Sequence, residues 1–238
     1  MIGPRPTTMI VTSSLADEIA FRLQAAILDG TYPPGTHLLQ DELCARFGVS
    51  RTPVREALRK LQAQHLIVIM PNRCATVRVP SREELIEVYA VRGELEGFAC
   101  ELAAARMGPK TFALLETAQA AIDAAAAEAL ANSEGDASLH ARFSSANDDF
   151  HRAIHDAAAN ARLKRIIDDL QSFFPKNVVW RAMRSSEEFR EVNCDEHERI
   201  RAALERGDGR RARREMGAHI RHARALLLAY LDEHVFWG

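Results

Sequence analysis

Nine histidines are spread through this chain of 238 residues, and three of them are spaced in a way that suits metal coordination. Asn147 and His151 stand four residues apart, so they share one face of a predicted helix. His197 and His219 fall on two further predicted helices, and a bundle can bring all three imidazoles around one ion. Scattered histidines are more often surface or hydrogen-bonded core residues, and the residues alone favour that plainer interpretation.

A basic segment of the sequence is suited to the recognition of nucleic acid. Residues 46–78 contain seven Lys or Arg and a single acid, Glu56. Arg51 and Arg55 lie four apart on one face of a predicted helix, and each guanidinium can donate to O6 and N7 of a guanine. Neighbouring hydroxyls can hydrogen-bond phosphate. The predicted contacts to double-stranded DNA are Ser50, Arg51, Thr52, Arg55, Arg59 and Arg73.

The charge is unevenly distributed along the chain, although its formal net value is only −2. Residues 1–80 carry 9 Lys or Arg and 6 Asp or Glu, whereas residues 81–238 carry 22 and 27. A compact basic segment followed by an acidic part is typical of a small DNA reader attached to a second domain.

Composition and cysteine usage indicate a cytoplasmic protein. The four cysteines are far apart and form no CxxC pair, which favours reduced thiols over a disulfide framework or a structural zinc site. No segment resembles a signal peptide, and charged residues interrupt every apolar stretch of membrane-spanning length. We therefore expect no membrane partner.

The elements that must position the arginines form a winged helix-turn-helix over residues 13–80, preceded by a flexible arm at 1–12. Gly48-Val49-Ser50 supplies the turn before the recognition helix, and Arg73 lies at the tip of a hairpin, within reach of the minor groove or the DNA backbone. The predicted helices span 14–29, 40–47 and 51–64, and the predicted strands 66–70 and 75–79.

Residues 81–238 contain only helical patterns, starting with a capping box at Ser81 and Glu84. Met107-Gly108-Pro109 ends the first of these helices. Further helices are predicted over 109–131, 137–158, 160–172, 186–206 and 209–233. The predicted fold is therefore mainly α, a winged helix-turn-helix followed by an all-α bundle of six or seven helices.

Two sequence runs make a family resemblance specific, GTYPPG at 30–35 and SRTPVREAL at 50–58. They resemble the signature of the GntR family of transcription regulators, whose base-reading arginines correspond to Arg51 and Arg55. His65 and Cys74 stand where that family commonly has Gly, and Asp41 stands near a position that is basic in some relatives.

The C-terminal half resembles the FCD ligand-binding domain of the FadR subfamily, and the two resemblances together cover residues 14–232. Such domains typically hold a divalent metal with an Asp and three His. The resemblance implies His151, His197 and His219 as ligands, with Asn147 at the Asp position, and an ion of the Zn, Ni or Mn type. Arg92 matches a family arginine, and is either an ion-pair partner of Glu96 or a cation placed to take a carboxylate.

These resemblances imply a homodimeric repressor, not an enzyme, that releases its DNA operator when a small organic acid or related metabolite binds. The sequence leaves two alternatives open. One is a metal-dependent enzyme that uses the histidine cluster, although no nucleophile motif or evident acid–base pair accompanies it. The other is a constitutive DNA-binding protein with a degenerate sensor, since Asn147 lacks the charge of the usual ligand.

Overall fold

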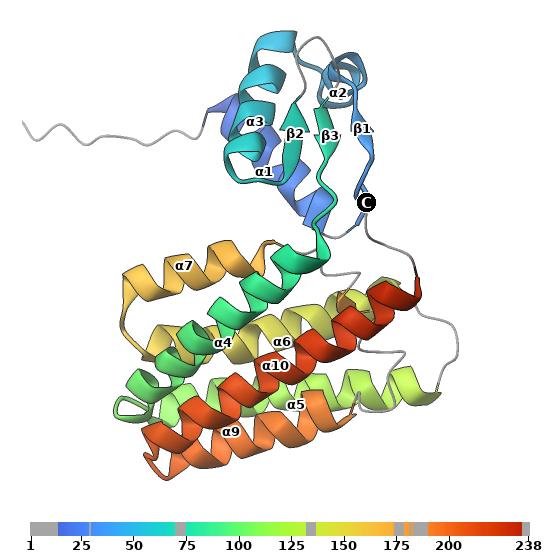
Figure 1. The fold of residues 1–238 in the computed structure, drawn as a ribbon. Coiled ribbons are helices and arrows are strands. Elements are labelled where there is room, and N and C mark those ends of the chain that lie inside the picture. Colours follow the sequence, from blue (N-terminus) through green and yellow to red (C-terminus); the bar gives the residue numbers. More distant parts are fainter. Residues whose placement is uncertain are drawn as a thin grey trace, which may run out of the picture. The chain divides into compact units, whose positions relative to one another are not determined.

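The computed structural model describes residues 14–28, 30–69, 75–131, 137–173, 179–180, 182 and 190–234. The chain forms two compact units, Met1–Arg78 and Val79–Gly238 (Figure 1). The predicted arm at 1–12 and the predicted hairpin tip, with Arg73 and Cys74, lie outside the described residues.

The first unit packs three helices against a small antiparallel sheet. Its elements are α1 (Leu15–Leu28), β1 (His37–Leu38), α2 (Gln40–Phe47), α3 (Arg51–Ala63), β2 (Ile67–Ile69) and β3 (Ala75–Val77). β3 lies between the other two strands, with Thr76 opposite both His37 and Val68. The sequence indicated only β2 and β3, because a two-residue strand such as β1 shows no readable alternation. The core is aliphatic, with Leu23 and Leu58 almost fully buried.

Local interactions set the ends of these helices. Ser14 and Asp17 form the predicted capping box, in which the Ser14 N–H donates to Asp17 Oδ2 at 2.9 Å and the Asp17 N–H donates to Ser14 Oγ at 3.1 Å. Gly48 ends α2 in the left-handed region, with φ 65°, and turns the chain toward α3. His65 follows α3 with φ 59°, so it adopts the conformation for which a glycine would be the usual residue.

Every secondary-structure element among the described residues of the second unit is helical, and the predicted all-α fold is confirmed. Its elements are α4 (Arg82–Ala104), α5 (Pro109–Ala131), α6 (Ala137–Ala157), α7 (Ala161–Gln171), η1 (Glu191–Asp195), α9 (Glu196–Glu205) and α10 (Gly209–Glu233). Ser81 caps α4 in the predicted capping box with Glu84. η1 is one turn of π-helix that runs directly into α9, a wider turn than the regular helix that the sequence predicted.

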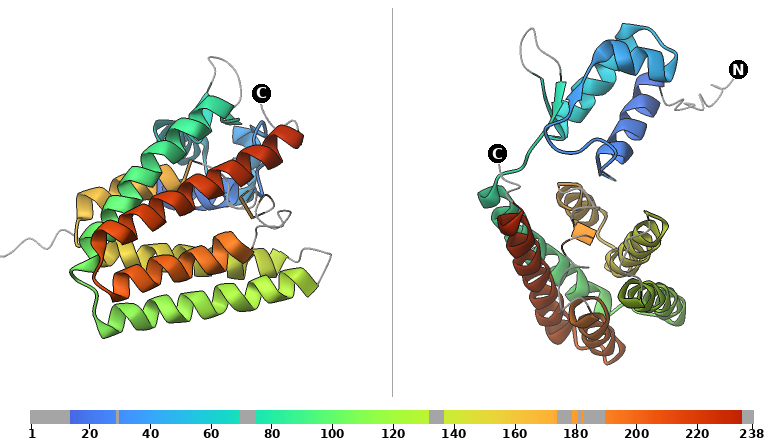
Figure 2. Two further views of the ribbon diagram at one scale, coloured as in Figure 1. Left: turned by 60° about the horizontal axis from the view of Figure 1, so that its bottom comes forward. Right: turned by 90° about the vertical axis from the view of Figure 1, so that its right-hand side faces the viewer.

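The helices α4 and α10 lie side by side and run in opposite directions (Figure 2). Glycines permit this close approach, because a Cβ added at Gly97 would lie 2.9 Å from the carbonyl oxygen of Arg213. A Cβ at Gly209 would lie 2.9 Å from the carbonyl oxygen of Glu101. Among the described helices, none is long and apolar enough to cross a membrane.

Candidate metal centre and DNA-binding surface

Three buried histidines meet inside the second unit. His151 comes from α6, His197 from α9 and His219 from α10, and none is more than 4% exposed. Their candidate ligand nitrogens all lie within 4.8 Å of one another. The ring centroids of His197 and His219 are 4.8 Å apart, and those of His151 and His219 are 5.3 Å apart. The structure therefore brings together the three histidines that the sequence singled out.

Each of these imidazoles has an acceptor at its Nδ1. Nδ1 of His151 lies 3.1 Å from Glu96 Oε2, and Nδ1 of His219 lies 2.9 Å from Glu196 Oε2. Because an ionised carboxylate can only accept, both Nδ1 atoms donate, and in the neutral tautomer that carries this proton the Nε2 atom has the lone pair. That tautomer is the one a metal ion requires of an Nε2 ligand.

The third acceptor is the side-chain amide of Gln119 on α5. Its Nε2 donates to Asp123 Oδ1 at 2.9 Å and to the carbonyl oxygen of Asn193 at 3.2 Å, which leaves its oxygen facing His197. Nδ1 of His197 lies 3.1 Å from that oxygen and therefore carries the proton. Nε2 of His197 is buried without a hydrogen-bond partner among the described residues, an arrangement that a metal ion would satisfy.

Burial also favours the form of histidine that binds metals. Burial lowers the pKa of His151, and it lowers the pKa of His197 further, with the neighbouring histidines acting in the same direction. Both rings are therefore neutral at neutral pH. Phe150 stacks on the His197 ring at 4.0 Å, nearly parallel, and helps to hold its orientation.

Glu96 of α4 is the centre of a second group of contacts beside the three histidines. It is fully buried, and it accepts from Arg92 Nε at 2.9 Å and from Gln171 Nε2 at 3.4 Å, in addition to His151. His155 Nε2 lies 3.3 Å from the same carboxylate. Although burial opposes ionisation, Arg92 and the two histidines hold the pKa of Glu96 well below its usual range.

The two other residues predicted to contact a metal ion or an effector occupy less central positions. Asn147 lies one helical turn before His151 on α6 and is partly buried. Arg92 is paired with Glu96, and its guanidinium lies 4.6 Å from the centre of the Tyr89 ring. The ion-pair interpretation of Arg92 thus describes this structure, while a role toward an effector remains a prediction.

Three of the arginines predicted to read DNA project from the exposed face of α3. Val54 and Leu58 are buried on the opposite face, whereas Arg51, Arg55 and Arg59 are exposed. Ser50 precedes α3 in an extended conformation, and Thr52 is exposed in its first turn.

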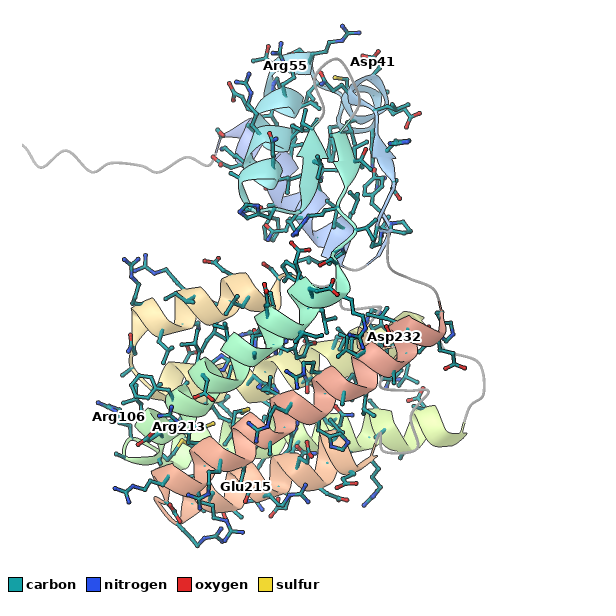
Figure 3. The ribbon with its side chains drawn as sticks, viewed as in Figure 1. Asp41, Arg55, Arg106, Arg213, Glu215 and Asp232 are labelled. Carbon is teal, nitrogen blue, oxygen red and sulfur yellow. The ribbon has the colours of Figure 1, made fainter. Side chains whose placement is uncertain are left out.

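Arg55 lies at the same end of the first unit as Asp41 (Figure 3). Arg51 forms a two-point ion pair with Asp41 of α2.

Family models match both units of the chain. Residues 15–77 match the model for bacterial regulatory proteins of the gntR family, and residues 87–222 match the FCD domain. The chain belongs to the GntR family.

Relatives of this GntR-family protein extend over almost its whole length. A probable D-xylose utilization operon transcriptional repressor of Paenarthrobacter nicotinovorans is 30% identical over 216 residues, which are 91% of this chain and 88% of the relative. The regulator LutR of Bacillus subtilis is 27% identical over 230 residues, 88% of this chain and 99% of the relative. The structure of Escherichia coli McbR superimposes with a TM-score of 0.73 at 25% identity, covering 91% of this chain and 98% of McbR.

These GntR-family relatives are transcriptional regulators rather than enzymes, and this chain is a transcriptional regulator with an FCD domain. The alternative of a metal-dependent enzyme finds no support among them. Sequence analysis of the regulator did miss the acceptors Gln119 and Glu196, and it considered Glu96 only as a partner of Arg92. The position of Glu196 directly before His197 was an available signal, whereas Gln119 lies 78 residues from His197 and gave none.

Proposed function

We propose that this regulator is a homodimeric repressor of the FadR subfamily that leaves its DNA operator when a small organic acid binds beside a metal ion in the FCD domain. The observation that carries the proposal is the convergence of three buried imidazoles, each of which has a hydrogen-bond acceptor at its Nδ1 atom. The relative from Paenarthrobacter nicotinovorans is named as a repressor of a sugar-utilization operon, which supports the repressor role.

In this proposal His151, His197 and His219 hold one divalent ion through their Nε2 atoms, and the side-chain oxygen of Asn147 is a fourth, weaker ligand. Three imidazole nitrogens and a neutral oxygen suit Zn or Ni better than Mn, which prefers carboxylate oxygens. The ion, when bound, supplies a positive centre for a carboxylate. Arg92 would add a second positive group toward the same ligand.

The operator is read by α3, with Arg51 and Arg55 donating to base edges in the major groove and Ser50, Thr52 and Arg59 contacting the backbone. Arg73 of the wing belongs to the same proposed surface. A twofold dimer would present two recognition helices to half-sites about one helical turn of DNA apart.

Glu96 suggests how the sensor communicates with the rest of the chain. It lies on α4, the helix that begins at Arg82, four residues after the first unit ends, and it holds the metal-ligand candidate His151. A change in the position of His151 therefore acts on α4 through its hydrogen bond with Glu96. An effector shifts the equilibrium only if it binds one arrangement of these helices better than the other.

Metal analysis of protein purified without a histidine tag tests the proposal directly. We expect about one divalent ion per chain, and we expect His197→Ala to lose it and to respond less to candidate organic acids in DNA-binding assays. His234→Ala is the matched control, because His234 is an exposed histidine of the same unit. Absence of metal from the wild-type chain, together with an unchanged acid response in His197→Ala, would contradict the proposal.

A further inference from the structure

An acidic residue lies next to the start of the recognition helix, where positive charge alone would suit DNA. Asp41, the second residue of α2, pairs with Arg51, the first residue of α3. Arg51 Nε lies 2.9 Å from Asp41 Oδ1, and Arg51 Nη2 lies 3.1 Å from Asp41 Oδ2. The side chains are 71% and 73% exposed, so the pair stands at the surface of the first unit.

This geometry occupies one edge of the guanidinium and leaves another available. The carboxylate takes Nε and one hydrogen of Nη2, while Nη1 and the second hydrogen of Nη2 face away from it. Two parallel N–H groups on that remaining edge are the pair that a guanine accepts at O6 and N7. Arg51 can thus be held by Asp41 and donate to a base at the same time.

We propose that Asp41 is a positioning residue that fixes Arg51 for the recognition of one guanine, so that it determines specificity at a single base pair. The inference rests on the proposed role of α3 in reading the operator. A free arginine loses rotamer freedom when it binds, and a side chain that is already oriented loses less. Arg55 and Arg59 form no such ion pair among the described residues, so Arg51 is the one arginine of α3 that a carboxylate orients.

The pair is unsuited to a mainly structural role. Ion pairs this exposed contribute little to stability, because water solvates both partners and salt screens them. A carboxylate near DNA also weakens the attraction between the protein and every phosphate backbone. Asp41 therefore lowers affinity for unrelated sequences, and its benefit lies in the discrimination that Arg51 provides.

The test uses the full chain and a duplex that the wild-type chain selects from a random-sequence DNA library. Dissociation constants are measured for that duplex, for its single-base-pair variants and for an unrelated duplex. Arg51→Ala first identifies the base pair whose discrimination depends on Arg51. Asp41→Asn is then compared with Glu42→Gln, which removes the same charge from the exposed neighbouring position on α2.

We expect Arg51→Ala to weaken binding to the selected duplex about 10- to 100-fold. Asp41→Asn should lower discrimination at the identified base pair about 5-fold and leave the other positions unchanged. Glu42→Gln should leave discrimination unchanged everywhere, and both variants should tighten binding to the unrelated duplex equally. In the double variant Arg51→Ala/Asp41→Asn, discrimination should match that of Arg51→Ala alone.

Equal discrimination by Asp41→Asn and Glu42→Gln would overturn the positioning role. Tighter binding of Asp41→Asn to the selected duplex, beyond that of Glu42→Gln, would also overturn it, because Asp41 would then compete with DNA for Arg51. Unchanged binding by Arg51→Ala would instead contradict the proposed reading of the operator by Arg51. The two failures are therefore distinguishable.

Discussion

At the scale of single residues, the candidate metal centre depends on groups that the three histidines contact on their outer side. Glu96 and Glu196 are carboxylates, whereas Gln119 is a neutral amide whose orientation Asp123 and the backbone of Asn193 determine. Such partners fix the tautomer and the direction of a ligand and so contribute to metal affinity. Glu196 serves two rings at once, since it also accepts from His222 at 2.8 Å.

Gln119→Leu removes the acceptor of His197 without removing a proposed metal ligand. The variant cannot accept the proton on Nδ1 of His197, so the ring is free to rotate or to change tautomer. We expect the affinity for Zn²⁺ to fall about 10- to 100-fold, measured by competition with a chromophoric chelator. Gln62→Leu, the same exchange at an exposed position of the first unit, should bind Zn²⁺ like the wild type. Equal affinities for both variants, in folded proteins, would show that Gln119 has no such role.

At the scale of secondary-structure elements, the close contact of α4 with α10 places one histidine helix against the helix that carries Glu96. Gly97 and Gly209 allow backbone to approach backbone, which no larger residue would permit at these distances. An ion pair between Arg82 and Asp232 joins the other end of the two helices at 3.0 Å. At Gly97 and Gly209 the spacing of these two helices is therefore limited by backbone atoms rather than by side chains.

Gly97→Ala should consequently destabilise the second unit. Alanine gains helix propensity, but its Cβ meets the carbonyl oxygen of Arg213, a backbone atom that can move only if α10 moves. We expect the free energy of unfolding to fall by about 1–3 kcal/mol, measured by urea denaturation followed by circular dichroism. Gly108→Ala is the control, because a Cβ at Gly108 meets nothing within 4 Å. If the two variants unfold at the same urea concentration, the close approach of α4 and α10 at Gly97 does not contribute to the free energy of unfolding.

At the scale of the whole molecule, two compact units share one chain, and α4 starts just after the first of them ends. The first unit carries α3 with its exposed arginines, and the second carries the buried histidines. Regulation requires that a ligand of the second unit change what the first unit does, and a symmetric assembly would let two copies act on one operator.

Light scattering of the purified chain tests this assembly. A chain of 26.5 kDa that dimerises should give a mass of twice that value, both alone and, after subtraction of the DNA, on its selected duplex. The physical reason is that two recognition helices related by a twofold axis match two half-sites. A single-chain mass under both conditions would rule out the dimeric repressor.

The sequence alone determined the class of the fold, most element boundaries and the family. Capping boxes at Ser14 and Ser81, the Gly48 turn and the helical periodicity are local features, and local interactions specify them wherever the rest of the chain lies.

The tertiary structure decided which distant groups meet. Gln119 and His197, or Glu96 and His151, are separated by 78 and 55 residues and come together only through the packing of different helices. It also decided that Asp41 contacts Arg51, because that contact depends on how α2 packs against α3, which neither helix specifies by itself.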